Sequence, residues 1–286
     1  MIDVRDDVAA VVVDFHAGGA LVECVESLRA NGVEDIVVVE NGGSGSSRDA
    51  LVDCEVTFVE PGMNLGYGRG VNRGAAACAQ RPYLLVSNPD IVVHEGAVVT
   101  LASYLELHPE VAVVGPRIVR LDGSVYPSQR VFPNMWLAGI HALLAPFWPQ
   151  NPASRRYRSP RGDGTVDWVS GAFFLIRREV FEEVGGFDER YFMFAEDMAL
   201  CWRVRQLGDT VEAIPEAVVT HIEGLSRARA SRAMLIAHHR SALRFEWQTA
   251  RGLRRALTPL AALVLGIRLS VVLARSRTLV DADCDS

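Results

Sequence analysis

Val8-Ala9-Ala10-Val11-Val12-Val13-Asp14-Phe15-His16 is an unbroken apolar run that ends in polar residues. A short apolar run without polar alternation is typical of a strand that is buried on both faces of a parallel sheet. Gly18 and Gly19 follow, and apolar residues at helical spacing then continue as far as Gly32. The stretch therefore predicts a strand and its crossover helix, which together form the repeating unit of α/β proteins.

The same unit repeats along the chain. Further buried strands are expected at residues 36–39, 56–59, 83–86, 111–114 and 173–176, and two short ones at 211–214 and 217–220. The fold class is α/β: a single Rossmann-like, mostly parallel sheet flanked by helices. Ligands of such sheets bind beyond the carboxyl ends of the strands. Polar side chains fall at these ends, namely Asp14, His16, Glu40, Asn41, Asn64 and Asp90.

Length and composition narrow the class of protein. The chain has 286 residues, of which 49% are hydrophobic, enough for one large domain or for one domain with an appendage. The net charge of −6 argues against general nucleic-acid binding. The 5 cysteines are scattered, and the opening Met1-Ile2-Asp3-Val4-Arg5 lacks the pattern of a signal peptide. We expect reduced thiols and a cytoplasmic protein.

A second stretch carries candidate chemistry. Gly185-Gly186-Phe187-Asp188-Glu189-Arg190-Tyr191-Phe192-Met193-Phe194-Ala195-Glu196-Asp197 runs from a turn through an aromatic segment to two adjacent carboxylates. A helical pattern starts there, and acidic residues favour the first turn of a helix. A carboxylate partly withdrawn from water beside aromatic rings is a candidate general base. The alternative is a helix cap beside the core.

The segment Gly68-Arg69-Gly70-Val71-Asn72-Arg73-Gly74 resembles a dinucleotide-binding fingerprint, and Asp90 follows about twenty residues later. That fingerprint should follow the first strand directly, whereas here Pro61 to Leu65 separate it from a later strand. An NAD(P)-dependent oxidoreductase is therefore disfavoured. A glycine-rich loop that opens a helix can still bind a diphosphate through its backbone N–H groups.

Asn88-Pro89-Asp90 places a carboxylate at the end of a strand. One or two carboxylates together with phosphate oxygens are what Mg²⁺ needs, and imidazole suits Mn²⁺ as well. Asp90 is therefore a candidate metal ligand, and His221, at the end of another predicted strand, is a candidate second ligand. A surface Asn-Pro-Asp turn is the alternative.

The C-terminal part differs in composition from the rest. Residues 227–277 are rich in Arg and hold a single acidic residue, Glu246, and residues 256–274 are mostly apolar. We expect a main domain over residues 1–225 and a helical arm over 226–286. The arm is interpreted as an amphipathic helix on an anionic membrane face. A helix packed on the main domain and a homodimer contact remain alternatives.

The ordered motifs carry a resemblance. They resemble those of the family-2 inverting glycosyltransferases with the GT-A fold: Glu40-Asn41-Gly42, residues 64–68, Asn88-Pro89-Asp90, Gly185-Gly186-Phe187-Asp188, Glu196-Asp197 and His221. Segments 122–128, 146–149, 187–193 and 237–241 are similar to the actinobacterial rhamnosyltransferases of cell-wall linker synthesis. Two positions depart from the family pattern. The second strand usually ends in Asp-Asn-Gly-Ser but here in Glu40-Asn41-Gly42-Gly43, and residue 14 is usually small or an amide but here is Asp14. Both departures bear on nucleotide preference.

The resemblance implies transfer of L-rhamnose from dTDP-L-rhamnose to N-acetylglucosaminyl-diphospho-decaprenol, with inversion, by an enzyme peripheral to the inner face of the cell membrane. It implies Asp197 as general base with Glu196 beside it, and Mg²⁺ or Mn²⁺ on Asp90 and His221. Donor-binding residues would be Asp14, Glu40, Asn41, Asn64, Gly66, Tyr67, Asn88, Ser170 and Gly171. Acceptor-binding residues would be Arg130, His238, His239 and Arg240. The alternatives are a transferase for another sugar nucleotide and a non-catalytic carbohydrate-binding protein.

Overall fold

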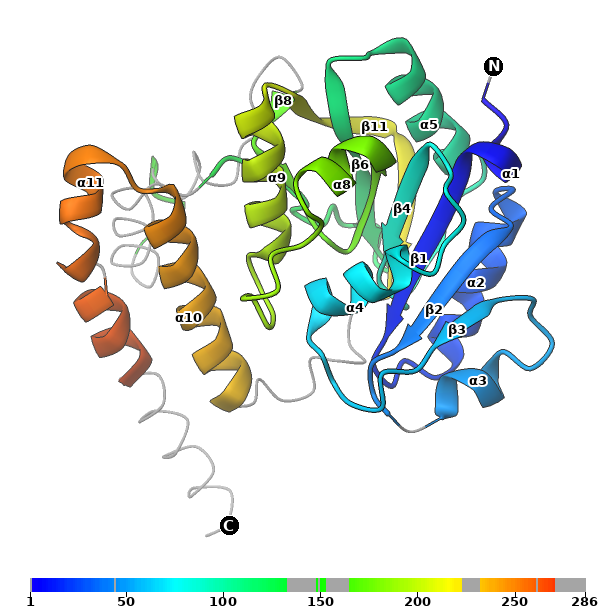
Figure 1. Ribbon diagram of the computed structural model, residues 1–286, viewed down its shortest axis with the longest axis horizontal. Helices are drawn as coiled ribbons and strands as arrows, with labels where there is room; N and C mark the ends of the chain where they lie inside the picture. Colours follow the sequence, from blue (N-terminus) through cyan, green and yellow to red (C-terminus); the bar gives the residue numbers. More distant parts are fainter. Residues whose placement is uncertain are drawn as a thin grey trace, which may run out of the picture.

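The computed structural model describes residues 2–43, 45–132, 148, 150–152, 165–222, 232–260 and 262–270. Most of residues 133–164, residues 223–231 and the arm beyond residue 270 lie outside these residues. The described chain forms a central sheet with helices on both faces, and the helices of the arm lie to one side (Figure 1).

Four parallel strands form the first half of the sheet, as predicted. They lie in the order β3-β2-β1-β4. Their bounds are Val8–Asp14 for β1, Asp35–Glu40 for β2, Thr57–Val59 for β3 and Tyr83–Ser87 for β4. Between or before them lie α1 (Val4–Asp7), α2 (Gly19–Ala30), α3 (Ser46–Ala50) and α4 (Tyr67–Ala75). The carboxyl ends of β1, β2 and β4 therefore meet at one edge.

The second half of the sheet is mixed. Next to β4 lies the antiparallel β10 (Phe173–Arg177), followed by β6 (Val111–Arg120), β11 (Thr210–His221) and β5 (Ile91–Val93). β8 (Thr165–Val166) also pairs with β11, and β7 (Gln129–Arg130) pairs with β9 (Trp168–Val169) in a small second sheet. Because β10 is antiparallel to β4, its start lies at the same edge as the end of β4: Phe173 pairs with Ser87.

Two strand predictions were wrong in part. β3 was expected to be buried, but it is the edge strand of the sheet, with Thr57 exposed and Phe58 and Val59 only partly buried. The two short strands expected at 211–214 and 217–220 are the single strand β11, whose register against β6 shifts between Ile214 and Val218. Pro215 lies in this irregular part, and proline has no N–H to donate to the ladder. The register of β11 against β6 therefore shifts at this point, but the strand continues to His221.

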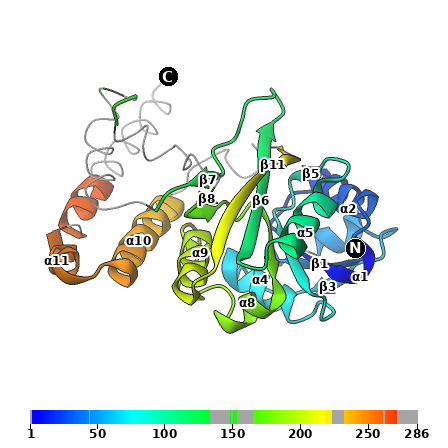
Figure 2. The same cartoon turned by 90° about the horizontal axis from the view of Figure 1, so that it is seen from above.

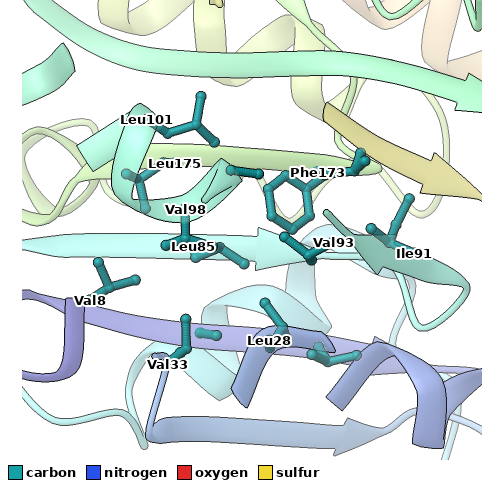
Figure 3. Packing of buried hydrophobic residues seen from close by; sticks show 14 of the residues in the cluster. Val8, Leu28, Val33, Leu85, Ile91, Val93, Val98, Leu101, Phe173 and Leu175 are labelled. Carbon is teal, nitrogen blue, oxygen red and sulfur yellow. The ribbon is translucent and has the colours of Figure 1, made fainter. Parts of the chain in front are cut away.

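The core has two layers, one on each face of the sheet. Along β1, Val8, Ala10 and Val12 belong to one layer, and Ala9, Val11 and Val13 belong to the other. The first layer is closed by α2 and α5 (Ala97–Leu107), as Figure 3 shows for Leu28, Val98 and Leu101. The second is closed by α4, α8 (Arg178–Glu183) and α9 (Glu196–Leu207). Since strand residues alternate between faces, burial on both sides explains why β1 has no polar alternation.

The glycine run of residues 68–74 lies within α4 and packs against the sheet. A Cβ atom on Gly74 would lie 2.5 Å from Val11 Cγ1, and one on Gly70 would lie 3.0 Å from Val13 Cγ1. Such distances leave no room for a side chain, so the glycines let this helix approach the sheet closely. This packing accounts for the resemblance to a dinucleotide fingerprint.

The described part of the arm is helical. It comprises α10 (Arg232–Thr249), α11 (Gly252–Ala256) and helical residues 258–260 and 262–270. α10 lies beside α9 in both views (Figures 1 and 2), and its Phe245 is buried in the second core layer, 5.7 Å from the Phe132 ring. Among the residues that the structure describes, none of the helices combines the length and apolarity needed to cross a bilayer.

Candidate active site

The last residues of β1 and β2 are acidic. Asp14 and Glu40 are partners in the strand register, and both are buried. The Asp14 carboxylate accepts hydrogen bonds from the Ala17 N–H (3.0 Å) and the Ser47 hydroxyl (2.6 Å), and Glu40 accepts one from the Gly45 N–H. Both carboxylates therefore hold the loops that surround the strand ends.

An amide pair shapes the loop before α4. Asn41 accepts a hydrogen bond from the Leu65 N–H (2.8 Å) and donates to the Asn64 side-chain oxygen (3.1 Å). Asn64 in turn accepts from the Gly66 N–H (2.8 Å). Gly66 has φ +86°, and a Cβ there would collide with the Phe192 carbonyl oxygen. The loop is thereby held against the aromatic segment that precedes α9.

The two adjacent carboxylates occupy the first turn of α9, as predicted. Phe194 and Ala195, just before them, both have positive φ (68° and 63°). Non-glycine residues in this conformation are strained, and such strain often marks functional sites. Asp197 accepts hydrogen bonds from the Met198 N–H at Oδ1 (2.7 Å) and from the Gly171 N–H at Oδ2 (2.8 Å). The turn thus aims Asp197 at the loop that leads into β10.

The electrostatics separate the roles of this pair. Burial, and then the charge of Asp197, raise the pKa of Glu196 to about 8. Burial also raises the pKa of Asp197, but the N–H groups of Gly171 and Met198 and the charge of Arg130 oppose that rise. Oε2 of Glu196 has no hydrogen-bond partner among the described residues. Near neutral pH, Glu196 therefore holds the proton more tightly, and Asp197 is the better-stabilised carboxylate.

Asp90 and His221 meet on another side of the site. His221 Nε2 lies 3.1 Å from Asp90 Oδ1, and both side chains are buried. The Ile222 N–H donates to the Asp90 carbonyl (2.9 Å), and the Tyr126 ring contacts the imidazole edge-on at 5.4 Å. The fold thus brings two residues that are far apart in the sequence into contact, and their role as metal ligands stays a prediction.

The pair fits a divalent ion. Two ligand atoms at right angles around an ion, each about 2.1 Å from it, are about 3.0 Å apart. A carboxylate with an imidazole is a donor set that Mn²⁺ accepts. Within the described ranges, no group of three or more His, Cys, Asp or Glu side chains is arranged to hold a metal. An ion on Asp90 and His221 would therefore complete its shell with oxygens from substrate or water.

Tyr67 connects the two sides. Burial raises its pKa well above the usual value, and the charges of Glu196, Asp197 and Asp90 raise it further. The phenol thus lies within electrostatic reach of all three carboxyls. The Asn88 N–H donates to the Ala172 carbonyl (2.8 Å), which joins the end of β4 to residues 170–172. The strand ends, the first turn of α9 and the Asp90–His221 pair therefore lie around Tyr67 and residues 170–172.

The predicted acceptor residues divide into two groups. Arg130 on β7 lies near Asp197, since its charge lowers the pKa of that carboxyl, and its guanidinium lies 5.5 Å from the centre of the Trp168 ring. On α10, His238 contacts the Phe194 ring (5.4 Å), His239 bonds to the Leu235 carbonyl of its own helix (2.8 Å), and Arg240 is exposed. The α10 residues therefore lie beside the segment that leads into α9. Among the described residues, none of the three contacts Asp197 or Asp90.

Two aromatic residues at the site were not predicted. Phe15 is exposed at the end of β1 next to His16, which has φ +58° and packs so closely on Gly42 that a Cβ there would lie 2.7 Å from its ring. Tyr126 fixes the His221 ring from a separate hairpin. Position directly after a buried strand was a usable signal for Phe15. Nothing in the spacing of Tyr126 pointed to His221, because their contact depends on the pairing of β6 with β11.

Comparison with known proteins now decides the family. Residues 5–242 match the family described as glycosyltransferase like family 2. The chain belongs to this family. The match extends beyond the predicted main domain into α10.

Relatives of this glycosyltransferase include named enzymes. It is 37% identical over 221 residues, 72% of each chain, to N-acetylglucosaminyl-diphospho-decaprenol L-rhamnosyltransferase of Mycobacterium tuberculosis. It is 26% identical over 206 residues, 70% of this chain and 62% of the relative, to the low-salt glycan biosynthesis hexosyltransferase Agl10 of Haloferax volcanii. Family membership and the rhamnosyltransferase relative make the protein a hexosyltransferase.

Solved structures show the same fold. GalNAc-T7, crystallised with UDP, GalNAc and Mn²⁺, aligns with a TM-score of 0.60 at 15% identity over 82% of this chain and 47% of that one. The mannosyltransferase PcManGT of Pyrobaculum calidifontis, in complex with GDP-Man and Mn²⁺, aligns with a TM-score of 0.58 at 14% identity over 96% and 80%. The predicted GT-A fold is confirmed.

Proposed function

We propose that this glycosyltransferase moves L-rhamnose from dTDP-L-rhamnose to an N-acetylglucosaminyl-diphospho-polyprenol, with inversion at the anomeric carbon. The observation that carries the proposal is the 37% identity to the mycobacterial enzyme over 72% of both chains. The site geometry supports it, because a hydrogen-bonded carboxylate and a candidate metal pair lie within electrostatic reach of one phenol.

Asp197 acts as the general base in this proposal. Inversion is a single displacement in which the acceptor hydroxyl attacks as the nucleoside diphosphate leaves, so one base must take the hydroxyl proton. Two backbone N–H groups keep Asp197 in one orientation and stabilise its charged form. Glu196 stays protonated beside it, so that the pair carries about one negative charge near neutral pH.

Asp90 and His221 would hold Mg²⁺ or Mn²⁺ on the diphosphate side. When bound, the ion neutralises charge that develops on the leaving diphosphate. The backbone of the loop at Asn64 to Tyr67 would lie along the diphosphate or the sugar, and Asn88, Ser170 and Gly171 would line the sugar. Glu40 and Asn41 at the end of β2 would face the nucleoside, with Asp14 holding their loop in place.

Arg130 is the basic residue best placed for the acceptor. Its charge reaches Asp197, so a diphosphate bound by its guanidinium would bring the acceptor sugar close to the base. His238, His239 and Arg240 would contribute from α10, on the side of the aromatic segment. Arg130→Ala should raise the KM for acceptor and leave donor affinity unchanged, whereas Arg48→Ala, an exposed arginine paired with Glu60, should change neither.

The donor proposal is tested by incubating the purified full chain with a polyprenyl-linked acceptor and Mg²⁺ or Mn²⁺. The donors to compare are dTDP-L-rhamnose, UDP-GlcNAc, UDP-galactose and GDP-mannose. Turnover with dTDP-L-rhamnose at the highest kcat/KM is expected. Turnover with another donor alone would replace the rhamnosyltransferase assignment, and binding without turnover of any donor would favour a non-catalytic carbohydrate-binding protein.

The arm is proposed to bind anionic lipid on the inner face of the cytoplasmic membrane, where a polyprenyl acceptor resides. Among the described residues that follow α10, the exposed large apolar side chains are Leu253, Leu260, Leu263, Val264 and Ile267. Residues 260, 263, 264 and 267 recur at helical spacing and so share one face, with exposed Arg251, Arg255 and Arg268 nearby. Apolar burial together with attraction of basic residues to anionic lipid favours interfacial binding.

Vesicle sedimentation tests the arm. The full chain should sediment with vesicles that contain anionic lipid and less with neutral ones. Leu263→Asp with Ile267→Asp should release it, whereas Leu107→Asp, an exposed apolar residue at the end of α5, should not. Unchanged sedimentation of the double variant would contradict membrane binding by this face. Loss of a dimer without loss of vesicle binding would show that the face is a protein contact.

A further inference from the structure

We infer that Tyr67 is a positioning residue for the general base: its hydroxyl holds the Gly171 carbonyl, and the N–H of the same residue orients Asp197. This inference rests on the proposed role of Asp197 and gives a second role to Tyr67, which the family resemblance assigns to donor binding.

The chain of hydrogen bonds runs through one residue, Gly171, whose carbonyl and N–H belong to two successive peptide units. The Tyr67 hydroxyl donates to the Gly171 carbonyl oxygen (2.5 Å), and the Gly171 N–H donates to Asp197 Oδ2 (2.8 Å). Gly171 lies between the two side chains: a Cβ there would be 3.2 Å from Asp197 Cβ and 3.4 Å from Tyr67 Cε1. The position of Gly171 is therefore set by the phenol on one side and meets the base on the other.

Tyr67 is itself fixed at its backbone. Its N–H donates to the Phe192 carbonyl (3.1 Å), and it is the first residue of α4, directly after the Asn64–Gly66 loop. One residue thus ties three segments that are far apart in sequence: the loop before α4, the aromatic segment before α9, and the loop before β10. A disturbance of the loop before α4 reaches the base through this residue.

The hydroxyl matters to the base for an electrostatic reason. Asp197 faces Glu196 on its own helix, Arg130 on β7 and the Tyr67 phenol on α4, and the buried Cys201 thiol lies one helical turn on. The Gly171 N–H favours the charged form of Asp197 and so lowers its pKa against the effect of burial. If the peptide is released, that stabilisation weakens and the pKa of Asp197 rises.

Tyr67→Phe tests the inference, because phenylalanine keeps the ring and removes only the hydroxyl. Tyr104→Phe is a matched control: its hydroxyl also donates at 2.5 Å, to Glu212, at the surface between α5 and β11. For Tyr67→Phe, kcat should fall about tenfold, which corresponds to about 1.4 kcal/mol in the barrier. The KM and Kd for dTDP-L-rhamnose should stay within about twofold, and the acid limb of the kcat–pH profile should move to higher pH.

Tyr104→Phe should leave kcat and the pH profile unchanged. A Tyr67→Phe variant with wild-type kcat and pH profile overturns the inference, and so does one whose donor Kd weakens in proportion to kcat, since the hydroxyl would then serve donor binding. If the wild type itself transfers no rhamnose, the proposed function fails instead. In that case the same variants are compared with the donor that the wild type does use.

Discussion

Replacing Asp197 by Asn removes the proposed base while keeping nearly the same shape. Positioned general bases contribute typically about 10²- to 10⁴-fold to rate, so kcat should fall by that factor, about 2.7–5.5 kcal/mol in the barrier. Donor affinity should change less than about threefold, because nothing in the proposal places this carboxylate on the nucleoside diphosphate.

The contacts of Asp197 set the cost to stability. Its two oxygens accept from the N–H groups of Met198 and Gly171, and Asn can keep only one of these bonds. An unmatched N–H costs about 1–3 kcal/mol, whereas removing a charge from a buried pair offsets part of that cost. The variant should therefore fold, with a net loss of about 2 kcal/mol or less in urea unfolding.

The assay is steady-state transfer at saturating donor and acceptor, with donor Kd from calorimetry. A variant that is folded, binds donor and retains more than about a tenth of wild-type kcat would refute the assignment of Asp197, since a lost base cannot cost so little. Parallel loss of donor affinity and kcat would point instead to a donor-binding carboxylate.

Three further changes have defined outcomes. Glu196 has a pKa of about 8 in the folded protein against 4.5 ordinarily, so its contribution to stability is full below about pH 4.5 and declines as pH rises toward 8. Between about pH 5 and pH 9, the free energy of unfolding in urea should therefore fall less for Glu196→Gln than for the wild type. Asp90→Asn and His221→Gln should each weaken Mn²⁺ binding in the presence of nucleoside diphosphate by about tenfold or more, measured by paramagnetic resonance, and unchanged affinity would remove the pair from the metal site. Gly66→Ala should destabilise more than Gly96→Ala, because both positions have positive φ (86° and 76°) but only Gly66 faces a neighbouring carbonyl; equal unfolding free energies would show that this loop yields.

Sequence periodicity was sufficient for the parallel half of the sheet. The strands β1, β2 and β4 were predicted because burial on both faces leaves a continuous apolar run, whereas β3 is only partly buried at the edge of the sheet. Acidic residues at the start of α9 were predicted from the helix dipole for an equally local reason. The antiparallel β10 and the continuous β11 were beyond such reasoning, since strand direction and register depend on partners far away in the chain.

The sequence by itself determined which residue types lie at the strand ends: carboxylates, amides and a histidine. Only the tertiary structure decided what each one touches. It paired Asp90 with His221, used both oxygens of Asp14 inside the protein, and turned the Tyr67 hydroxyl toward Gly171. Local propensity depends on neighbouring residues in the sequence. These contacts form instead where the β4–β10 and β6–β11 pairings bring distant segments to one edge of the sheet, and the sequence pattern does not specify which distant strands pair.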